Sequence, residues 1–154
     1  MPARPDDTPQ ARILRMRRID RLGDALFRGL TRLGIGPAWS LTTRGRRTGR
    51  LHTVPVIPVD NGRQQWLVSP YGEVSWVLNA RAAGQVQLSR GRTTRIWRVR
   101  EVAAAEAGPV LKRYVRITSA TRPYFTASVD APVAVFVAEA DRHPVFALTQ
   151  GDVP

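Results

Sequence analysis

Residues 41–50, LTTRGRRTGR, are the most informative segment of this chain. Gly45 and Gly49 allow a tight turn after a pair of threonines, and such a turn exposes successive backbone N–H groups that form a nest for an anion. Four arginines surround the turn, and guanidinium groups match phosphate oxygens in pairs. We therefore expect a hairpin with a phosphate-binding tip, although an ordinary hairpin with a solvated basic tip fits the same residues.

The sequence on either side of this turn predicts further antiparallel hairpins. Asp60–Gly62 and Arg90–Gly91 are turn sequences, and Pro55 and Pro58 place the strand that they interrupt at a sheet edge or a bulge. The predicted strands cover 39–43, 51–59, 65–69, 86–88, 93–102 and 145–148. The fold class is therefore mainly β with flanking helices (α+β), with an antiparallel sheet that closes into a small barrel.

Two helices are predicted within this β-rich region. The first covers 74–83, with Glu73 in its first turn and Gly84 just after its end, and the second covers 103–117 despite Pro109. The almost unbroken apolar run 132–138 predicts one more strand, buried on both faces.

The region before the barrel divides into two parts. Residues 1–10 lack an apolar period and predict a disordered arm, whereas 11–34 carry an amphipathic helix among many arginines. Its apolar stripe is Ile19, Leu22, Leu26, Leu30 and Leu33. Two interpretations stay open, because the helix can pack on the barrel domain (35–150) or bind an anionic membrane surface as a monotopic anchor. No apolar run is long enough to span a bilayer and no secretory segment follows Met1, so we expect a cytoplasmic protein, with membrane association left open.

The charge composition indicates which classes of partner the protein attracts. The 154 residues include 24 Lys and Arg against 12 Asp and Glu, a formal net charge of +12 that attracts nucleic acid, anionic lipid or a polyanionic small molecule. Cysteine is absent, which excludes disulfides, thiolate metal sites and a cysteine nucleophile. Two histidines are too few for a three-histidine metal site, and no metal is expected.

Further candidate site residues lie after the basic turn, in the segment 69–79 and at two tyrosines. In SPYGEVSWVLN (69–79) a strand ends and a helix begins, so N–H donors are available there. We interpret Trp76 as a core residue and expect the Asn79 amide to make a structural hydrogen bond. Tyr114 and Tyr124 are the candidates to donate a proton. Paired carboxylates and a Ser-His-Asp set are absent, so the chemistry is expected to come from a cofactor.

Five segments together resemble the deazaflavin-dependent nitroreductase family. They are LTTRGRRTGR, HTVPVIPV, a D-x-G turn, WLVSPYG and WVLNARAAG, and the similarity covers roughly 39–102. Members are actinobacterial proteins with a split β-barrel fold, similar to FMN-binding barrels, that use coenzyme F-420, an 8-hydroxy-5-deazaflavin with a phosphate and an oligoglutamate tail. The resemblance implies that fold and that cofactor for this chain.

The resemblance also implies which residues bind the cofactor. The phosphate is held by the basic turn and its neighbours, and His52 stands where the family has a further basic residue. The backbone of Val54, Pro55 and Val56 lies against the deazaflavin ring, and the helix with Trp76 and Asn79 borders the same cleft. The remaining implied cofactor-binding residues are Thr43, Gly45, Arg46, Arg47, Thr48, Gly49, Ser69, Pro70 and Tyr71. Tyr114 and Tyr124 reproduce the family's tyrosine-rich substrate wall only in part, so a nitro-drug substrate is not implied.

The expected function is a reductase that transfers a hydride from reduced F-420 to a small hydrophobic acceptor, an activated C=C, enone or quinone, in a monomer or homodimer. A protein hydroxyl or water would supply the proton. The alternatives are an FMN-binding split-barrel oxidoreductase and a non-catalytic cofactor- or lipid-binding module. Nucleic-acid binding is least favoured, because only 7% of residues are aromatic and no RNA- or DNA-binding motif is present.

Overall fold

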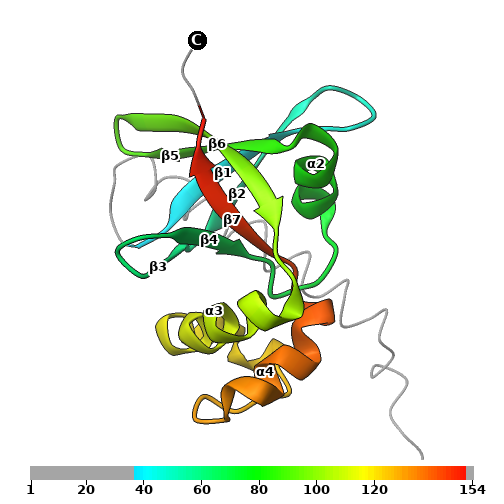
Figure 1. The fold of residues 1–154 in the computed structure, drawn as a ribbon. Helices are drawn as coiled ribbons and strands as arrows, with labels where there is room; N and C mark the ends of the chain where they lie inside the picture. Colours follow the sequence, from blue (N-terminus) through cyan, green and yellow to red (C-terminus); the bar gives the residue numbers. More distant parts are fainter. Residues whose placement is uncertain (1–36, 152–154) are drawn as a thin grey trace, which may run out of the picture.

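The computed structural model describes residues 37–151, so the predicted arm 1–10 and helix 11–34 lie outside the described residues. Seven strands form one sheet in the order β2-β1-β5-β6-β7-β4-β3, and every neighbouring pair is antiparallel. The strands are β1 (Trp39–Arg44), β2 (Leu51–Val56), β3 (Val59–Asp60), β4 (Gln65–Val68), β5 (Gln85–Arg90), β6 (Thr93–Glu101) and β7 (Val145–Gln150). The sheet curls into a half-open barrel (Figure 1), which confirms the predicted split barrel.

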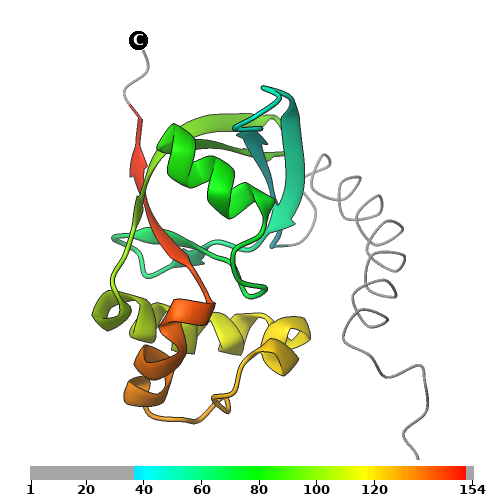
Figure 2. The same cartoon turned by 90° about the vertical axis from the view of Figure 1, so that its right-hand side faces the viewer.

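Helices occupy two places around this sheet. Figure 2 shows α2 (Ser75–Ala83) lying across the hollow of the curled sheet, while α3 (Ala104–Ile117) and α4 (Val133–Glu139) form a separate layer at one end. Two short 3-10 helices, η1 (Ser119–Tyr124) and η2 (Ala140–Arg142), complete this helical layer. Gly84 ends α2 in the left-handed conformation, with φ of 71°, as its position after the helix predicted.

Pro55 and Pro58 are tolerated because they lie at or next to the edge strands of the sheet. The predicted strand 51–59 is two strands, β2 and β3, which lie at opposite edges of the sheet and are joined by Ile57 and Pro58. Pro55 pairs with Ser40 of β1 on the edge strand β2, where a residue without an N–H is tolerated. The expected edge position is therefore confirmed, and the barrel stays split between β2 and β3.

The described residues form two hydrophobic cores on the two sides of β4 and β7. Inside the barrel, Leu67, Phe146 and Leu148 pack with Trp76 and Val77 of α2. On the other face, Trp66, Val68 and Ala147 pack with the helical layer, of which Leu111 and Phe136 are fully buried. Because side chains alternate along a strand, these two short strands contribute to both cores.

The predicted buried strand 132–138 is wrong, because this segment forms helix α4. Pro132 precedes the first helical residue, a position where its missing N–H removes no helical hydrogen bond. Phe136 is fully buried, whereas Val133 and Val135 are 38% and 40% exposed, so the run has one buried face only. An apolar run of this length does not distinguish a helix from a strand by periodicity. The expected first-turn position of Glu73 is also wrong, since α2 begins at Ser75.

Candidate functional site

The basic loop, residues 45–50 between β1 and β2, has a defined backbone. Gly45 N–H donates to Arg50 O at 2.7 Å, and Gly49 N–H donates to Gly45 O at 2.9 Å. Gly49 has φ of 71°, a conformation that favours glycine. A Cβ at Gly45 would lie 3.0 Å from Thr48 Oγ1 and 3.2 Å from His52 Nε2, so the loop closes tightly over this glycine. The turn thus favours glycine at 49 through its backbone conformation and leaves little room for a side chain at 45.

Asn79 connects the basic loop to α2. Its side chain is 2% exposed, and its Oδ1 accepts from Arg46 N at 3.2 Å and from Arg46 Nη1 at 3.1 Å. Its Nδ2 donates to the buried Thr43 Oγ1 at 3.2 Å. The expected structural hydrogen bond of Asn79 is confirmed, and its amide acts on the loop from inside the barrel.

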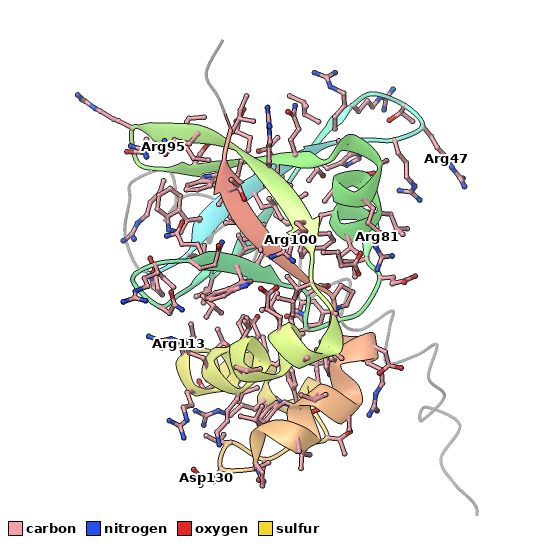
Figure 3. The ribbon with its side chains drawn as sticks, in the orientation of Figure 1. Arg47, Arg81, Arg95, Arg100, Arg113 and Asp130 are labelled. Carbon is pink, nitrogen blue, oxygen red and sulfur yellow. The ribbon has the colours of Figure 1, made fainter. Side chains whose placement is uncertain are left out.

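The outer side of the basic loop is open and positively charged. Residues 46–50 are exposed, and within residues 37–151 no carboxylate pairs with Arg47. Figure 3 shows Arg47 extending from the tip of the loop, away from the barrel. Arg44 Nη1 instead donates to Gly49 O at 3.1 Å and braces the turn. The loop therefore offers guanidinium groups whose charge is not neutralised by the described chain.

Strand β2 continues from this loop. His52 is exposed at its start, while Val54, Pro55 and Val56 are half-buried. Val54 and Val56 pack against the barrel core. Among residues 37–151, β2 is an edge strand, and one row of its backbone groups has no neighbouring strand there, so a flat polar ligand can contact it.

The loop 69–74 joins β4 to α2 and lies between the barrel and the helical layer (Figure 2). Ser69 is fully buried, and its hydroxyl donates to Gly72 O at 2.6 Å. Gly72 has φ of 86°. Trp76 is 8% exposed and packs on Phe146 with ring centroids 5.7 Å apart, so it belongs to the core as expected. Tyr71, in contrast, is 58% exposed.

The structure brings Tyr71 together with Tyr124. Their rings meet edge to face, with centroids 4.6 Å apart and planes at 89°, and Tyr124 is 37% exposed. Tyr114 lies elsewhere: it is 5% exposed inside the helical layer, beside Phe125. Burial raises the pKa of its phenol, an effect that the hydroxyl groups of Thr121 and Thr118 partly offset. The exposed aromatic pair therefore combines one predicted catalytic residue with one predicted cofactor-binding residue.

A buried polar couple, Glu139 and His143, is not among the residues predicted from the sequence. Glu139 is 2% exposed and His143 is 4% exposed, and Glu139 Oε2 lies 3.7 Å from His143 Nε2. Burial alone would raise the pKa of Glu139, but the N–H groups of Ala127 and Thr126 and the nearby His143 lower it below the ordinary 4.5. A helix prediction over 133–139 would have placed Glu139 at the helix end, with His143 four residues further along the chain.

A separate pocket of about 280 Å³ opens at another part of the barrel. Its lining residues are Trp39, Pro58, Gln65, Leu88, Thr93, Arg95 and Trp97. None of them is among the predicted site residues. Figure 3 places Arg95 and Arg47 on opposite sides of the barrel, so this pocket is distinct from the basic loop.

The comparisons with known proteins agree with the fold. The family model described as "F420H(2)-dependent quinone reductase" matches residues 22–140, which is more than half of the chain. No curated protein matches the chain significantly.

Solved structures share the fold. An F420-H2 dependent reductase is 24% identical, with 73% of this chain and 94% of that one covered and a TM-score of 0.51. A chain solved as a domain-swapped dimer is 21% identical, with 92% and 100% covered and a TM-score of 0.54. A putative 5-nitroimidazole antibiotic resistance protein from Bacteroides thetaiotaomicron is 10% identical, with 81% and 79% covered and a TM-score of 0.54.

Proposed function

The chain belongs to the F-420-dependent quinone reductase family and is thus an F-420-dependent oxidoreductase; from this premise we propose that its acceptor is a small hydrophobic molecule with an activated C=C, enone or quinone group. The observation that carries the proposal is the open basic loop followed by the edge strand β2 and the exposed pair Tyr71–Tyr124. Together they provide a place for an anion, a flat ring and a second flat molecule.

The donor set of the basic loop fits the cofactor's acidic groups. Arg46 and Arg47 present guanidinium groups at a glycine turn, and Thr48 and the turn's backbone N–H groups add neutral donors. A phosphate with a glutamate tail carries several negative charges, and the formal net charge of +12 favours such a ligand over FMN, which lacks the tail. In this proposal Arg47 binds the phosphate directly, whereas Asn79 and Thr43 hold the loop in place.

The rest of the predicted cofactor site follows from β2 and loop 69–74. We assign the backbone of Val54, Pro55 and Val56 to the deazaflavin ring and His52 to the polar end next to the loop. Trp76 and Ser69 are buried, so they support the cleft through packing and through the Ser69–Gly72 hydrogen bond. Tyr71 is the exposed aromatic residue of this loop, and we assign it to contact a bound molecule.

When bound, reduced F-420 supplies a hydride from C5 of its ring. Reduction of the acceptor also takes up a proton, and we assign the Tyr124 hydroxyl to hold it. The rings of Tyr71 and Tyr124 cover one side of the acceptor and exclude water. Tyr114 is assigned a packing role, because its side chain belongs to the helical core.

Cofactor choice and the role of Arg47 are tested in one titration. F-420 is expected to bind more tightly than FMN, with an affinity that falls as salt rises. Arg47→Ala should weaken F-420 binding by about 1.5–3 kcal/mol, the range for hydrogen bonds to charged groups. Arg113→Ala makes the same charge change at the opposite end of the molecule (Figure 3) and should leave binding nearly unchanged. Equal losses in both variants would reduce the effect to net charge, and no loss at Arg47 would remove it from the site.

The domain boundary and the acceptor have separate tests. Residues 35–150 are proposed to bind the cofactor without the preceding segment, so removal of 1–34 should preserve F-420 affinity and lower co-sedimentation with anionic vesicles at low salt. None of the helices within residues 37–151 has the length and apolar character needed to cross a membrane. The acceptor is identified by mixing the protein and reduced F-420 with each of a series of quinones and enones and monitoring the oxidation of F-420 by its absorbance. Absence of turnover with all of them would contradict the assignment.

A further inference from the structure

Glu139, the last residue of α4, holds the segment that follows Tyr124. Its Oε2 accepts from Thr126 N at 2.9 Å and its Oε1 accepts from Ala127 N at 3.0 Å. The carboxylate is 2% exposed, so these two backbone donors replace water around a buried charge. The position of residues 126–127 is therefore fixed by α4.

His143 holds the segment that precedes Tyr71. Its Nδ1 lies 2.9 Å from Pro70 O, and because a carbonyl oxygen only accepts, Nδ1 carries the hydrogen. The imidazole ring also stacks on Phe125, with centroids 4.0 Å apart and planes at 24°. His143 thus contacts both the loop 69–74 and the end of η1.

The two contacts converge on the exposed tyrosines. Pro70 immediately precedes Tyr71, and Phe125 immediately follows Tyr124. The two tyrosines come from distant parts of the chain, yet their rings meet edge to face at 4.6 Å. Each one is therefore next in sequence to a residue that His143 contacts, and Glu139 fixes the backbone just beyond Phe125.

The energetics favour a positioning role over a purely stabilising one. A buried carboxylate beside an imidazole is weak evidence for stability, because apolar side chains of similar volume often stabilise a core as well or better. What an apolar pair lacks is direction: it has no donor for Pro70 O and no acceptor for the N–H groups of Thr126 and Ala127. Directional bonds at both loops set the relative position of the two aromatic rings.

We propose that Glu139 and His143 are positioning residues that hold Tyr71 and Tyr124 as one wall against the flat acceptor, and so determine how the acceptor binds without touching the cofactor. This inference rests on the proposed function, in which the acceptor lies at the tyrosine pair. The couple acts through the tyrosines and is not itself part of the basic loop or of β2.

The test compares two substitutions of His143. His143→Phe keeps a ring on Phe125 but loses the donor to Pro70, whereas His143→Asn keeps a donor at the place of Nδ1. In the full chain without cofactor, His143→Phe should speed amide hydrogen exchange in 69–74 by about tenfold, the loss of one buried hydrogen bond, and His143→Asn should restore much of it. With reduced F-420 bound, His143→Phe should raise KM for a quinone about tenfold, with kcat and F-420 affinity close to wild type.

Two further variants keep the proposal testable if His143→Phe fails to fold. Tyr71→Ala removes the wall directly and should reproduce the rise in KM, and Glu139→Gln should speed exchange in 122–127. Unchanged exchange in His143→Phe, or an unchanged KM in Tyr71→Ala, would overturn the proposal. Failure of the wild type to bind F-420 would instead overturn the proposed function, and it would leave the hydrogen-exchange result intact.

Discussion

The barrel core and the helical core each contain a buried polar side chain that organises an exposed loop, but the two side chains differ in charge. Asn79 in the barrel is neutral and both donates and accepts, so one amide satisfies Thr43 and Arg46. Glu139 in the helical layer only accepts, and it needs two backbone N–H groups and lies beside His143. The basic loop is therefore held by a group that does not titrate, whereas the tyrosine wall is held by a carboxylate, which does.

The largest expected effect is at the charged position. Glu139→Ala leaves the buried Ala127 N–H and the partly buried Thr126 N–H without an acceptor and His143 beside an empty space, and it should lower the free energy of unfolding by about 3–5 kcal/mol. Chemical denaturation measures this loss. The folded fraction should bind F-420 normally, because Glu139 has no contact with the basic loop. A smaller loss of unfolding free energy than in Asn79→Ala would contradict the expected order of the two positions.

The neutral position should show the opposite division of effects. Asn79→Ala should lower the free energy of unfolding by about 1–3 kcal/mol, because it leaves the Arg46 N–H and the buried Thr43 hydroxyl without the amide. F-420 affinity should fall about tenfold as the loop loses its attachment. Asn61→Ala is the matched control: Asn61 Oδ1 accepts from the backbone of Arg63 and Gln64 in another hairpin, so its loss should leave F-420 affinity unchanged. Similar F-420 affinities in the two variants would show that Asn79 does not organise the site.

A pH series separates the two regions further. The pKa of Glu139 is lowered in the folded protein, because the N–H groups of Ala127 and Thr126 and the neighbouring His143 outweigh burial, which would raise it. Its contribution to stability is therefore present above the ordinary value of 4.5 and is lost as the pH falls through the lower folded-state value. The stability gap between wild type and Glu139→Gln should shrink below pH 4.5, whereas the gap for Asn79→Ala should stay constant. A parallel decline of both gaps would assign the pH dependence to other groups.

The smallest effect belongs to an ion pair on the surface. Arg81 of α2 pairs with Glu73 at 2.9 Å and with Glu101 of β6 at 2.7 Å, and the Glu73 side chain is 62% exposed. Glu73→Gln should change the free energy of unfolding by less than about 1 kcal/mol, because solvent and salt screen such a pair and Glu101 remains. Thermal melts at low and high salt check this value. A loss as large as that of Glu139→Ala would contradict the distinction between buried and exposed charges.

The local sequence predicted most strands and turns of the fold and, in the candidate site, the basic loop. Gly62, Gly84 and Gly91 have positive φ at the predicted turns and helix end. A single glycine is enough to indicate such a conformation, because other residues rarely adopt it. The basic loop is likewise continuous in sequence. The tyrosine pair joins distant segments, and the roles of Glu139 and His143 depend on their contacts with residues 126–127 and with Pro70. Predicting 132–138 as a strand also kept Glu139 off any helix. Periodicity could not correct this, since the run is apolar at nearly every position.

The place of β7 in the sheet has a consequence for biosynthesis. β7 (Val145–Gln150) is the last strand in sequence, yet it lies between β6 and β4 and contributes Phe146 and Leu148 to one core and Val145 and Ala147 to the other. A ribosome-bound chain that ends before residue 145 therefore lacks the strand that joins the two halves of the sheet. The sheet can close only after residues 145–150 have emerged, and until then the edges of β4 and β6 that pair with β7 stay open to chaperones.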